Sequence, residues 1–503
     1  MTTTIASVPS VTVEVGGTAL AGQAARCLAM VRVRQNLATP AQCELTFHTQ
    51  LSTKLPDLGA QLVVRVALQD DPLFAGQLTA CEHVFSGYGE HSVILRAYDP
   101  LHQLRKRQQP RVLVQTTVAA IAVELASQIG LDCETAVDGP TWQNVLQHRE
   151  SDLELLVQLA ARCGLYPVVA GSTLRLITLE GDGDAVSLQW GSTLLEATVE
   201  LNGDRSARRV TAAGWDPLTA QSFEGRASQA RSGRQTRAEV SPTAVGGADE
   251  FALFGEFASD RDHADALAQA ELDARAAGEV TLSGTAEGDT RLTAGTPIEA
   301  SGLTDEIDGR YVICEAVHAI DAEHGYLTHF STRPPTARGR ANAAAAAVGE
   351  VTSVDDPDRR GRVRVKFPAY DNLESDWLGV VAAGAGSARG IVALPDVGDH
   401  VLVVFAHEDA ATGIVIGGLY GTGGPPDPGV VDAAVRRFSI HTADGQQVVL
   451  DDDQHRLRLA DKSGSSVELA PGGVTIHAAN DLTIEAPGKT VTIRANSVEF
   501  DQG

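Results

Sequence analysis

The sequence has little methionine, few aromatic residues and no long apolar run. Only 2 of its 503 residues are Met and 5% are aromatic, whereas 49 are Gly and 21 are Pro. This composition disfavours long helical bundles and favours many short strands joined by turns. No segment approaches the roughly 18 consecutive apolar residues that a membrane-spanning helix needs, so we expect no stable membrane insertion.

Basic segments are also scarce. The chain has 65 Asp and Glu against 40 Lys and Arg, a formal net charge of −25, and its longest basic run is Arg105–Arg107. Such a chain repels polyanions, so we expect no binding to nucleic acid. The first residues lack a basic segment and an apolar segment, so no signal peptide is expected. The six cysteines form no C-x-x-C pair and are interpreted as small core residues.

The length suggests three or four domains. Residues 1–340 contain many segments with period-two alternation, which predicts strands. They are interrupted by helical patterns, expected at about 118–130, 151–163 and 260–277. Ser151 followed by Glu154 predicts a capping box at the second helix. The third pattern is rich in alanine, and its Asp, Glu and Arg residues are expected on its outer face.

A Pro-, Arg- and Ala-rich stretch at 332–347 is typical of a linker and marks a domain boundary. Beyond it, residues 348–421 show a run of short strands, a size that matches an OB-fold domain. The expected strands are Val348–Thr352, Arg362–Phe367, Gly390–Leu394, His400–Phe405 and Gly413–Gly417.

Residues 436–503 carry apolar-polar-apolar triplets at intervals of about eight residues. One strand and one turn per repeat leave the apolar face of each strand uncovered by its own chain. The pattern therefore predicts an intertwined β-prism, or β-helix, made by several copies of the chain. The alternative is a β-meander that ends a globular domain. The expected shared core consists of Val474, Ile476, Leu482, Ile484, Val491, Ile493, Val498 and Phe500.

The motifs resemble the spike proteins of contractile injection systems, the valine-glycine-repeat (VgrG) family, which is similar to a fusion of a phage baseplate hub and a tail spike. The resemblance rests on Tyr98-Asp99-Pro100-Leu101, on the Glu150-Ser151-Asp152 helix start with Gly164, and on Trp377 and the Pro395–Asp399 segment with Gly398. These motifs occur in the family order over nearly the whole chain. The Val-Gly repeat itself is weak here.

The resemblance implies a mainly β homotrimer with tandem hub β-barrels and a few helices, an OB-fold domain and a C-terminal trimeric prism. It implies a mechanical function, joining a hexameric inner tube and the baseplate proteins to a puncturing tip. No effector domain is expected, and a small cone-shaped cap resembling PAAR-repeat proteins is expected on residues 495–503. The resemblance also implies assembly in the producer's cytoplasm into a phage tail-like particle, either released or retained.

No catalytic, cofactor-binding or metal-ligating constellation is predicted, so the chain is not expected to be an enzyme. Asp451–Asp453 is interpreted as a polar turn, with a cation site as the alternative. Glu150, Asp152 and Glu154 are interpreted as acidic residues that complement a helix N-terminus, not as an acid–base pair. Two other functions stay open: a cell-wall or polysaccharide hydrolase on a β-prism stalk, and a receptor-binding tail fibre.

Overall fold

The computed structural model describes residues 9–48, 56–87, 90–216, 221–256, 258, 260–335, 345–368, 372–405, 413–421 and 423–501. It divides into two compact units, residues 1–418 and residues 419–503. None of the helices in the described part of the chain combines the length and hydrophobicity that a membrane crossing needs.

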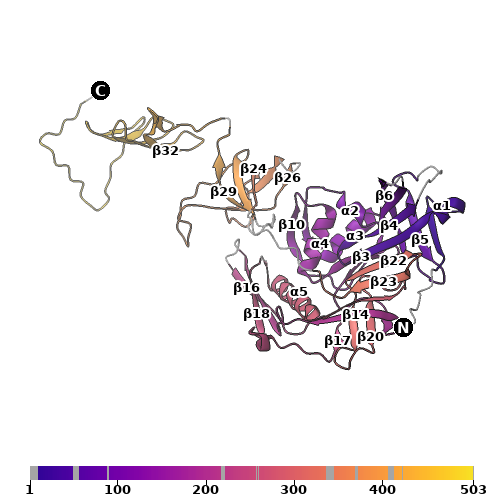
Figure 1. Ribbon diagram of the computed structural model, residues 1–503. Helices are drawn as coiled ribbons and strands as arrows, with labels where there is room; N and C mark the ends of the chain where they lie inside the picture. The colour runs from indigo at the N-terminus through magenta and orange to yellow at the C-terminus, as the bar shows by residue number, and fades with distance from the viewer. Residues whose placement is uncertain are drawn as a thin grey trace. The chain divides into compact units, whose positions relative to one another are not determined.

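The largest sheet of the first unit joins strands from both ends of residues 1–335. Within the described residues it has eleven strands, in the order β14-β19-β23-β22-β3-β4-β7-β6-β5-β1-β2. Their bounds are Leu194–Leu201, Val280–Glu287, Gly325–Ser331, Glu315–Asp321, Leu28–Asn36, Thr39–His48, His91–Tyr98, Phe74–Phe85, Gln61–Val66, Val11–Val15 and Thr18–Ala19. In Figure 1, β22 and β23 lie beside β3 and β4, although the two pairs are far apart in the sequence.

This sheet contributes to two separate hydrophobic cores. The first core is formed by β1 and β3–β7, with Val33, Leu45 and Leu62 fully buried in it. The second is formed by β14, β19 and β23 against a smaller sheet, with Leu282 and Ile298 at its centre. The smaller sheet contains β13 (Val186–Gln189), β20 (Pro297–Ser301), β21 (Gly309–Val312) and β17 (Gln235–Thr236).

The three expected helices are present, close to their expected positions, as α3 (Val118–Gln128), α4 (Asp152–Arg162) and α5 (Arg261–Glu279). The shorter α1 (Gly22–Arg26) and α2 (His102–Arg105) and a 3₁₀ turn at Pro242–Val245 are additional. The capping box of α4 is confirmed: the Ser151 hydroxyl accepts the Glu154 N–H and the Glu154 carboxylate accepts the Ser151 N–H. Gly130 and Gly164 follow α3 and α4 with φ of 74° and 69°, left-handed values that glycine tolerates best.

The core around these helices also holds two small sheets. One pairs β8 (Arg111–Thr116) with β10 (Trp142–Gln147), and the other contains β11 (Tyr166–Ala170), β12 (Thr173–Ile177) and β9 (Asp132–Thr135). A further sheet of β16 (Gln221–Ala227), β15 (Arg209–Asp216) and β18 (Glu250–Glu256) packs against α5. A Cβ at Gly225 would lie 2.0 Å from the backbone of Ala264, so glycine permits this close packing.

The expectation that α5 turns all its charged residues outward is wrong. Asp273 and Glu279 are 1% and 2% exposed. Asp273 pairs with Arg231 at 2.9 Å, and Glu279 pairs with Arg208 at 3.0 Å and with Arg234 at 3.1 Å. These arginines lie just before β15 (Arg208) and between β16 and β17 (Arg231 and Arg234), and the sequence of the helix alone does not reveal such partners.

The OB-fold region is the last part of the first unit in the sequence. Its sheet has the order β26-β25-β24-β28-β29-β27, formed by Leu373–Glu374, Arg364–Phe367, Ala345–Ser353, His400–Phe405, Gly413–Leu419 and Gly379–Val380. Four of the expected strands are present. The fifth, at 390–394, is not a strand, and Ile391 and Val392 are exposed there. Most of the expected linker, residues 336–344, lies outside the described residues.

The second unit is a meander of successive antiparallel strands. After the short pair β30 (Val430–Val431) and β31 (Ala434–Val435) come β32 (Arg437–His441), β33 (Gln447–Asp451), β34 (Arg456–Ala460), β35 (Ser466–Ala470) and β36 (Gly473–His477). The triplet at 474–476 lies on a strand. Those at 482–484, 491–493 and 498–500 do not, so a single chain forms the meander and leaves the later repeats without a strand partner among the described residues.

Candidate functional site

The sheet of β8 and β10 is shared by two hydrophobic cores. On one side Val145 and Leu113 pack into the core around α3 and α4. On the other side Leu146 and Val112 pack into the core of the OB-fold region, which includes Phe405. Because neighbouring residues of a strand point to opposite faces, consecutive apolar residues place β10 between the two cores. The OB-fold region is therefore packed on the first part of the chain as well as linked to it.

Polar contacts also join β10 to the OB-fold region, and this contact between the two is called the junction below. The Asn144 side-chain amide donates to Asp376 at 2.8 Å, and Asp376 also accepts from Arg364 at 3.4 Å. The Arg364 guanidinium lies over the Trp377 ring, 5.1 Å from its centroid, within the range of a cation–π interaction. The motif residue Trp377 thus lies directly beside the junction.

A buried carboxylate holds β10 in place. Asp152 is 0% exposed and accepts from Gln147 of β10 at 2.9 Å and from Arg111 of β8 at 3.1 Å. Arg107 approaches its other oxygen at 3.3 Å. The sequence interpretation, a carboxylate that complements the start of a helix, therefore describes only part of its role. Asp152 joins α4, β8 and β10, and its partner Arg111 is distant in the sequence and becomes a neighbour only in the folded chain.

Glu150 continues the network toward the OB-fold region. Its carboxylate accepts the backbone N–H groups of His148 and Arg149 at 3.2 and 3.1 Å, and lies 3.4 Å from the His148 ring. The His148 ring in turn packs near the Phe405 ring, with centroids 6.1 Å apart. The acidic residues of the Glu-Ser-Asp motif are thus held by backbone, amide and cationic groups of the chain.

The residues of the Tyr98-Asp99 motif are connected to this network through α2. Asp99 accepts the N–H groups of Ala41 and Leu101 at 2.9 and 3.0 Å and so anchors the start of α2. After α2, the Arg107 carbonyl accepts the Asp152 N–H at 2.9 Å. The Tyr-Asp motif and the Glu-Ser-Asp motif therefore belong to one connected structure. In the Tyr-Asp motif, the guanidinium of Arg105 lies over the Tyr98 ring, 4.8 Å from the ring centroid.

The two motif glycines act differently. A Cβ at Gly164 would lie 3.1 Å from the Arg231 guanidinium and 3.2 Å from the backbone of Ala270, so its absence lets the end of α4 approach α5. Gly398 has φ of 90° and open space around it, so it serves the turn before β28, where its N–H donates to the Val351 carbonyl.

The meander of the second unit has one apolar face. Directly opposed residues of antiparallel strands share a face, and the register aligns Ile440, Val448, Leu459, Val467 and Ile476 in one row. A second row on the same face consists of Phe438, Leu450, Leu457, Leu469 and Val474. Together these rows are called the apolar face below.

Much of this face is open to solvent. Ile476 is 62% exposed and Phe438 64%. A hollow of about 640 Å³ lies over the first row and is also lined by Leu482. All eight predicted core residues, from Val474 to Phe500, are exposed in the single chain, and Phe500 is 93% exposed.

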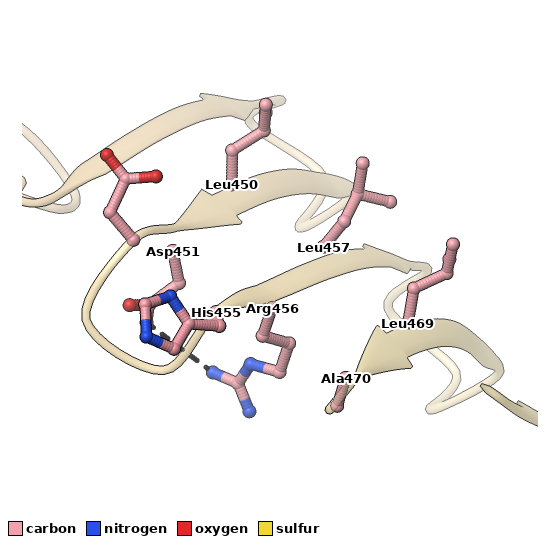
Figure 2. Close-up of a pocket in the computed structure, with 8 residues that line it drawn as sticks. Leu450, Asp451, His455, Arg456, Leu457, Leu469 and Ala470 are labelled. Atoms are coloured by element: carbon pink, nitrogen blue, oxygen red, sulfur yellow. Dashed lines mark ion pairs between the residues drawn. The ribbon is translucent and has the colours of Figure 1, made fainter. Parts of the chain in front are cut away.

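The second row borders a further hollow, of about 400 Å³ (Figure 2). Leu450, Leu457 and Leu469 project to the same side from successive strands, while Arg456 projects to the other side, where it pairs with Asp451 at 3.9 Å. The Asp451 carboxylate accepts the backbone N–H groups of the two residues at 453 and 454, so the expected polar turn is present. Among the described residues, no three His, Cys, Asp or Glu side chains are arranged to hold a metal ion.

Sequence reasoning missed the residues of the junction. Asn144 and Leu146 belong to no motif, and their partners in the OB-fold region lie more than two hundred residues away in the chain. One signal was present: Val145 and Leu146 are adjacent apolar residues in a short strand, a pattern typical of a strand buried on both faces.

Comparison with known proteins gives two family matches. Residues 35–324 match the phage tail baseplate hub (GPD) family, and residues 347–420 match the type VI secretion system/phage-baseplate injector OB domain. Of the residues in the junction, β8 and β10 lie in the first match and Asp376 and Phe405 in the second.

Solved structures with the same fold include three tail and secretion proteins. An Escherichia coli type VI secretion component, c3393, has 15% identity and a TM-score of 0.51, covering 78% of this chain and 96% of its own. The Francisella PdpA–VgrG complex has 10% identity and a TM-score of 0.54, covering 93% and 79%. A 43 kDa tail protein of prophage MuSo2 from Shewanella oneidensis has 14% identity and a TM-score of 0.50, covering 65% and 98%.

Shortening Leu146 should loosen the OB-fold region together with the helical core. Leu146→Ala removes buried methyl groups from the shared junction, and we expect a loss of ~2–5 kcal/mol in stability. Val114 of β8 is 61% exposed, so Val114→Ala is the matched control, with an expected change within ~0.5 kcal/mol. Amide hydrogen exchange should become faster in β25 and β28 as well as in β10. Faster exchange confined to residues 111–165 would show that the two cores are not coupled.

The Asp99 carboxyl should make stability depend on pH. Burial raises the pKa of Asp99 from 3.8 to about 7, against the lowering effect of its two N–H partners. The folded state therefore holds this proton up to about pH 7, whereas the unfolded state releases it near pH 4. Stability should decrease as pH rises between these two pKa values, by ~1.4 kcal/mol for each pH step of one.

The test compares urea unfolding at several pH values for the natural chain and for Asp99→Asn. The variant is expected to be less stable overall, because its amide N–H₂ faces one of the two backbone donors, but to lose this part of the pH dependence. Asp70→Asn, at an exposed position, is the control. Equal slopes for the natural chain and Asp99→Asn between pH 4 and 7 would contradict the role given to this carboxyl.

Proposed function

The chain belongs to the phage tail baseplate hub family, and we propose that it works as a homotrimeric spike that joins an inner tube to a puncturing tip. It is a structural component of a contractile injection system of the VgrG type: the hub family covers more than half of the chain, and the injector OB domain follows it. The VgrG-type fold of the solved structures agrees with this function.

The apolar face of the second unit is the main observation that supports a trimer. Two rows of apolar side chains lie on one side of the meander, and the opposite side carries charged residues such as Arg456 and Glu468, paired at 3.6 Å. A single chain leaves this surface in water at a cost of ~25 cal/mol per Å². Further copies of the same chain offer the same rows, so threefold association covers all of them at once.

The later repeats support the same arrangement. The triplets at 482–484, 491–493 and 498–500 alternate apolar and polar residues but pair with no strand among the described residues of the single chain. Backbone N–H and C=O groups in an extended segment need partners, and neighbouring copies can supply them. We therefore propose that residues 478–501 become strands of an intertwined prism when three chains meet, with Ile484 and Ile493 in its core.

Neighbouring positions on β33 provide a sharp test of the trimer. Leu450 lies on the apolar face, while Val449 pairs with Ser439 and Arg458 on the opposite face. Leu450→Asp should place one carboxylate from each copy in the shared core, where desolvation is costly, and should prevent the trimer from forming. Val449→Asp should leave it intact.

The measurement is the molar mass from light scattering of the full chain. The natural chain and Val449→Asp are expected at three times the chain mass of 52.8 kDa, and Leu450→Asp at a lower mass. A monomeric natural chain would contradict the proposal, as would a trimer that Leu450→Asp leaves unchanged.

The first unit would carry the contacts with the tube. The two hydrophobic cores to which its largest sheet contributes give each chain two β-rich bodies, so three chains would offer six to a hexameric inner tube. Through β10, force from the tube would pass to the OB-fold region by packed side chains instead of by residues 332–347 alone. The baseplate proteins would surround the same unit.

The C-terminal repeats would carry a separate cap protein. Phe500 is the most exposed large apolar residue after Leu68 in the described part of the chain, and no strand described there covers residues 495–501. We infer that a small cone-shaped protein similar to PAAR-repeat tips covers this apolar end. The proposal treats the chain as non-enzymatic: its best acid–base candidates, Glu150 and Asp152, are held in structural hydrogen bonds.

Co-expression with an inner-tube protein and a PAAR-type cap protein tests both contacts. We expect the tube protein to co-purify with the natural chain and with Phe500→Asp, whereas the cap protein should be lost from Phe500→Asp. Electron microscopy should place the tube at the end that carries the hub. Cap binding that survives Phe500→Asp would contradict the proposed capping surface.

A further inference from the structure

The hairpin of β6 and β7 brings two imidazole rings together at its outer end. His83 of β6 and His91 of β7 lie diagonally across the strands, because His83 is opposite Val93 and His91 is opposite Phe85. The His83 Nδ1 is 3.0 Å from the His91 Nε2, and the rings are nearly parallel, 12° apart. His83 is exposed and His91 is half-buried, so solvent reaches the pair.

From this geometry we propose that His83 and His91 form a two-histidine site for a borderline transition-metal ion such as Zn²⁺, Ni²⁺ or Cu²⁺. Two nitrogens 3.0 Å apart share one hydrogen bond when no metal is bound. A metal ion with N–metal distances of about 2.0–2.1 Å holds two tetrahedral nitrogens about 3.3 Å apart, so small ring rotations suffice to replace the shared proton by the ion.

The neighbours of the pair favour this use. The Phe85 ring stacks on His91 with centroids 4.4 Å apart and 5° between planes, so one face of that imidazole is packed. The strands fix the two Cα positions, so little order has to be gained when a metal binds. The chain's net charge of −25 also attracts cations to its surface.

Imidazole nitrogen suits these metals, whereas Ca²⁺ and Mg²⁺ prefer oxygen ligands. The Glu82 carboxylate is engaged elsewhere, since it pairs with Arg96 at 2.7 Å. Water would therefore complete the coordination shell, and the bound ion would fasten the outer ends of β6 and β7 together.

The experiment uses the full chain without an affinity tag of histidines. One equivalent of Cu²⁺ is added, and pulsed electron paramagnetic resonance counts the imidazoles on the ion. We expect two imidazoles in the natural chain, and the loss of this two-imidazole signal in His83→Ala and in His91→Ala. His329→Ala removes an exposed histidine whose ring pairs with Thr285, and should leave the signal unchanged.

Zn²⁺ supplies a second, independent readout. Hydrogen exchange in residues 79–96 should slow when Zn²⁺ is added to the natural chain and should not respond in His83→Ala. Because neither histidine belongs to a hydrophobic core, circular dichroism of the variants should match that of the natural chain. A natural chain without a two-imidazole signal would overturn the proposal, as would a signal that persists in His83→Ala.

Discussion

The burial of the Asp152 carboxylate constrains the whole first unit. A charge with 0% exposure is tolerated only where cations and donors surround it, and Arg107, Arg111 and Gln147 meet this need from three different segments. Satisfying the carboxylate therefore fixes α4 against β8 and β10. The same strand β10 also supplies Leu146 to the core of the OB-fold region, so the buried ion network and the contact between the two regions share one strand.

The second unit follows the opposite principle. Its meander satisfies backbone hydrogen bonds within one chain but leaves one face of apolar side chains without cover. Such a surface is unfavourable for an isolated chain and favourable for an assembly. Stability in the first unit thus comes from contacts that each chain makes alone, whereas stability in the second is expected to depend on association.

Local signals in the sequence predicted local structure well. The capping box at Ser151 and Glu154 and the glycine after each of α3 and α4 depend on neighbouring residues, and the structure confirms them. The segment 390–394 has a strand-like pattern but joins no sheet in the described part of its own chain, so the strand prediction there is wrong. The ion pairs of Asp152 and the contact between Asn144 and Asp376 join distant segments, and no local pattern encodes such partners.

The choice of arginine over lysine connects these observations. Arginine greatly outnumbers lysine in the sequence, although either would balance charge equally well. A guanidinium group can donate two parallel hydrogen bonds to one carboxylate, whereas an ammonium group acts as a point charge. Arg362 binds Asp356 in the OB-fold region, and Arg437 binds Asp427 before the meander, each with two donors. Paired guanidinium hydrogen bonds fix the direction of these contacts, which suits the force-bearing role proposed for the chain, whereas a flexible lysine would leave that direction free.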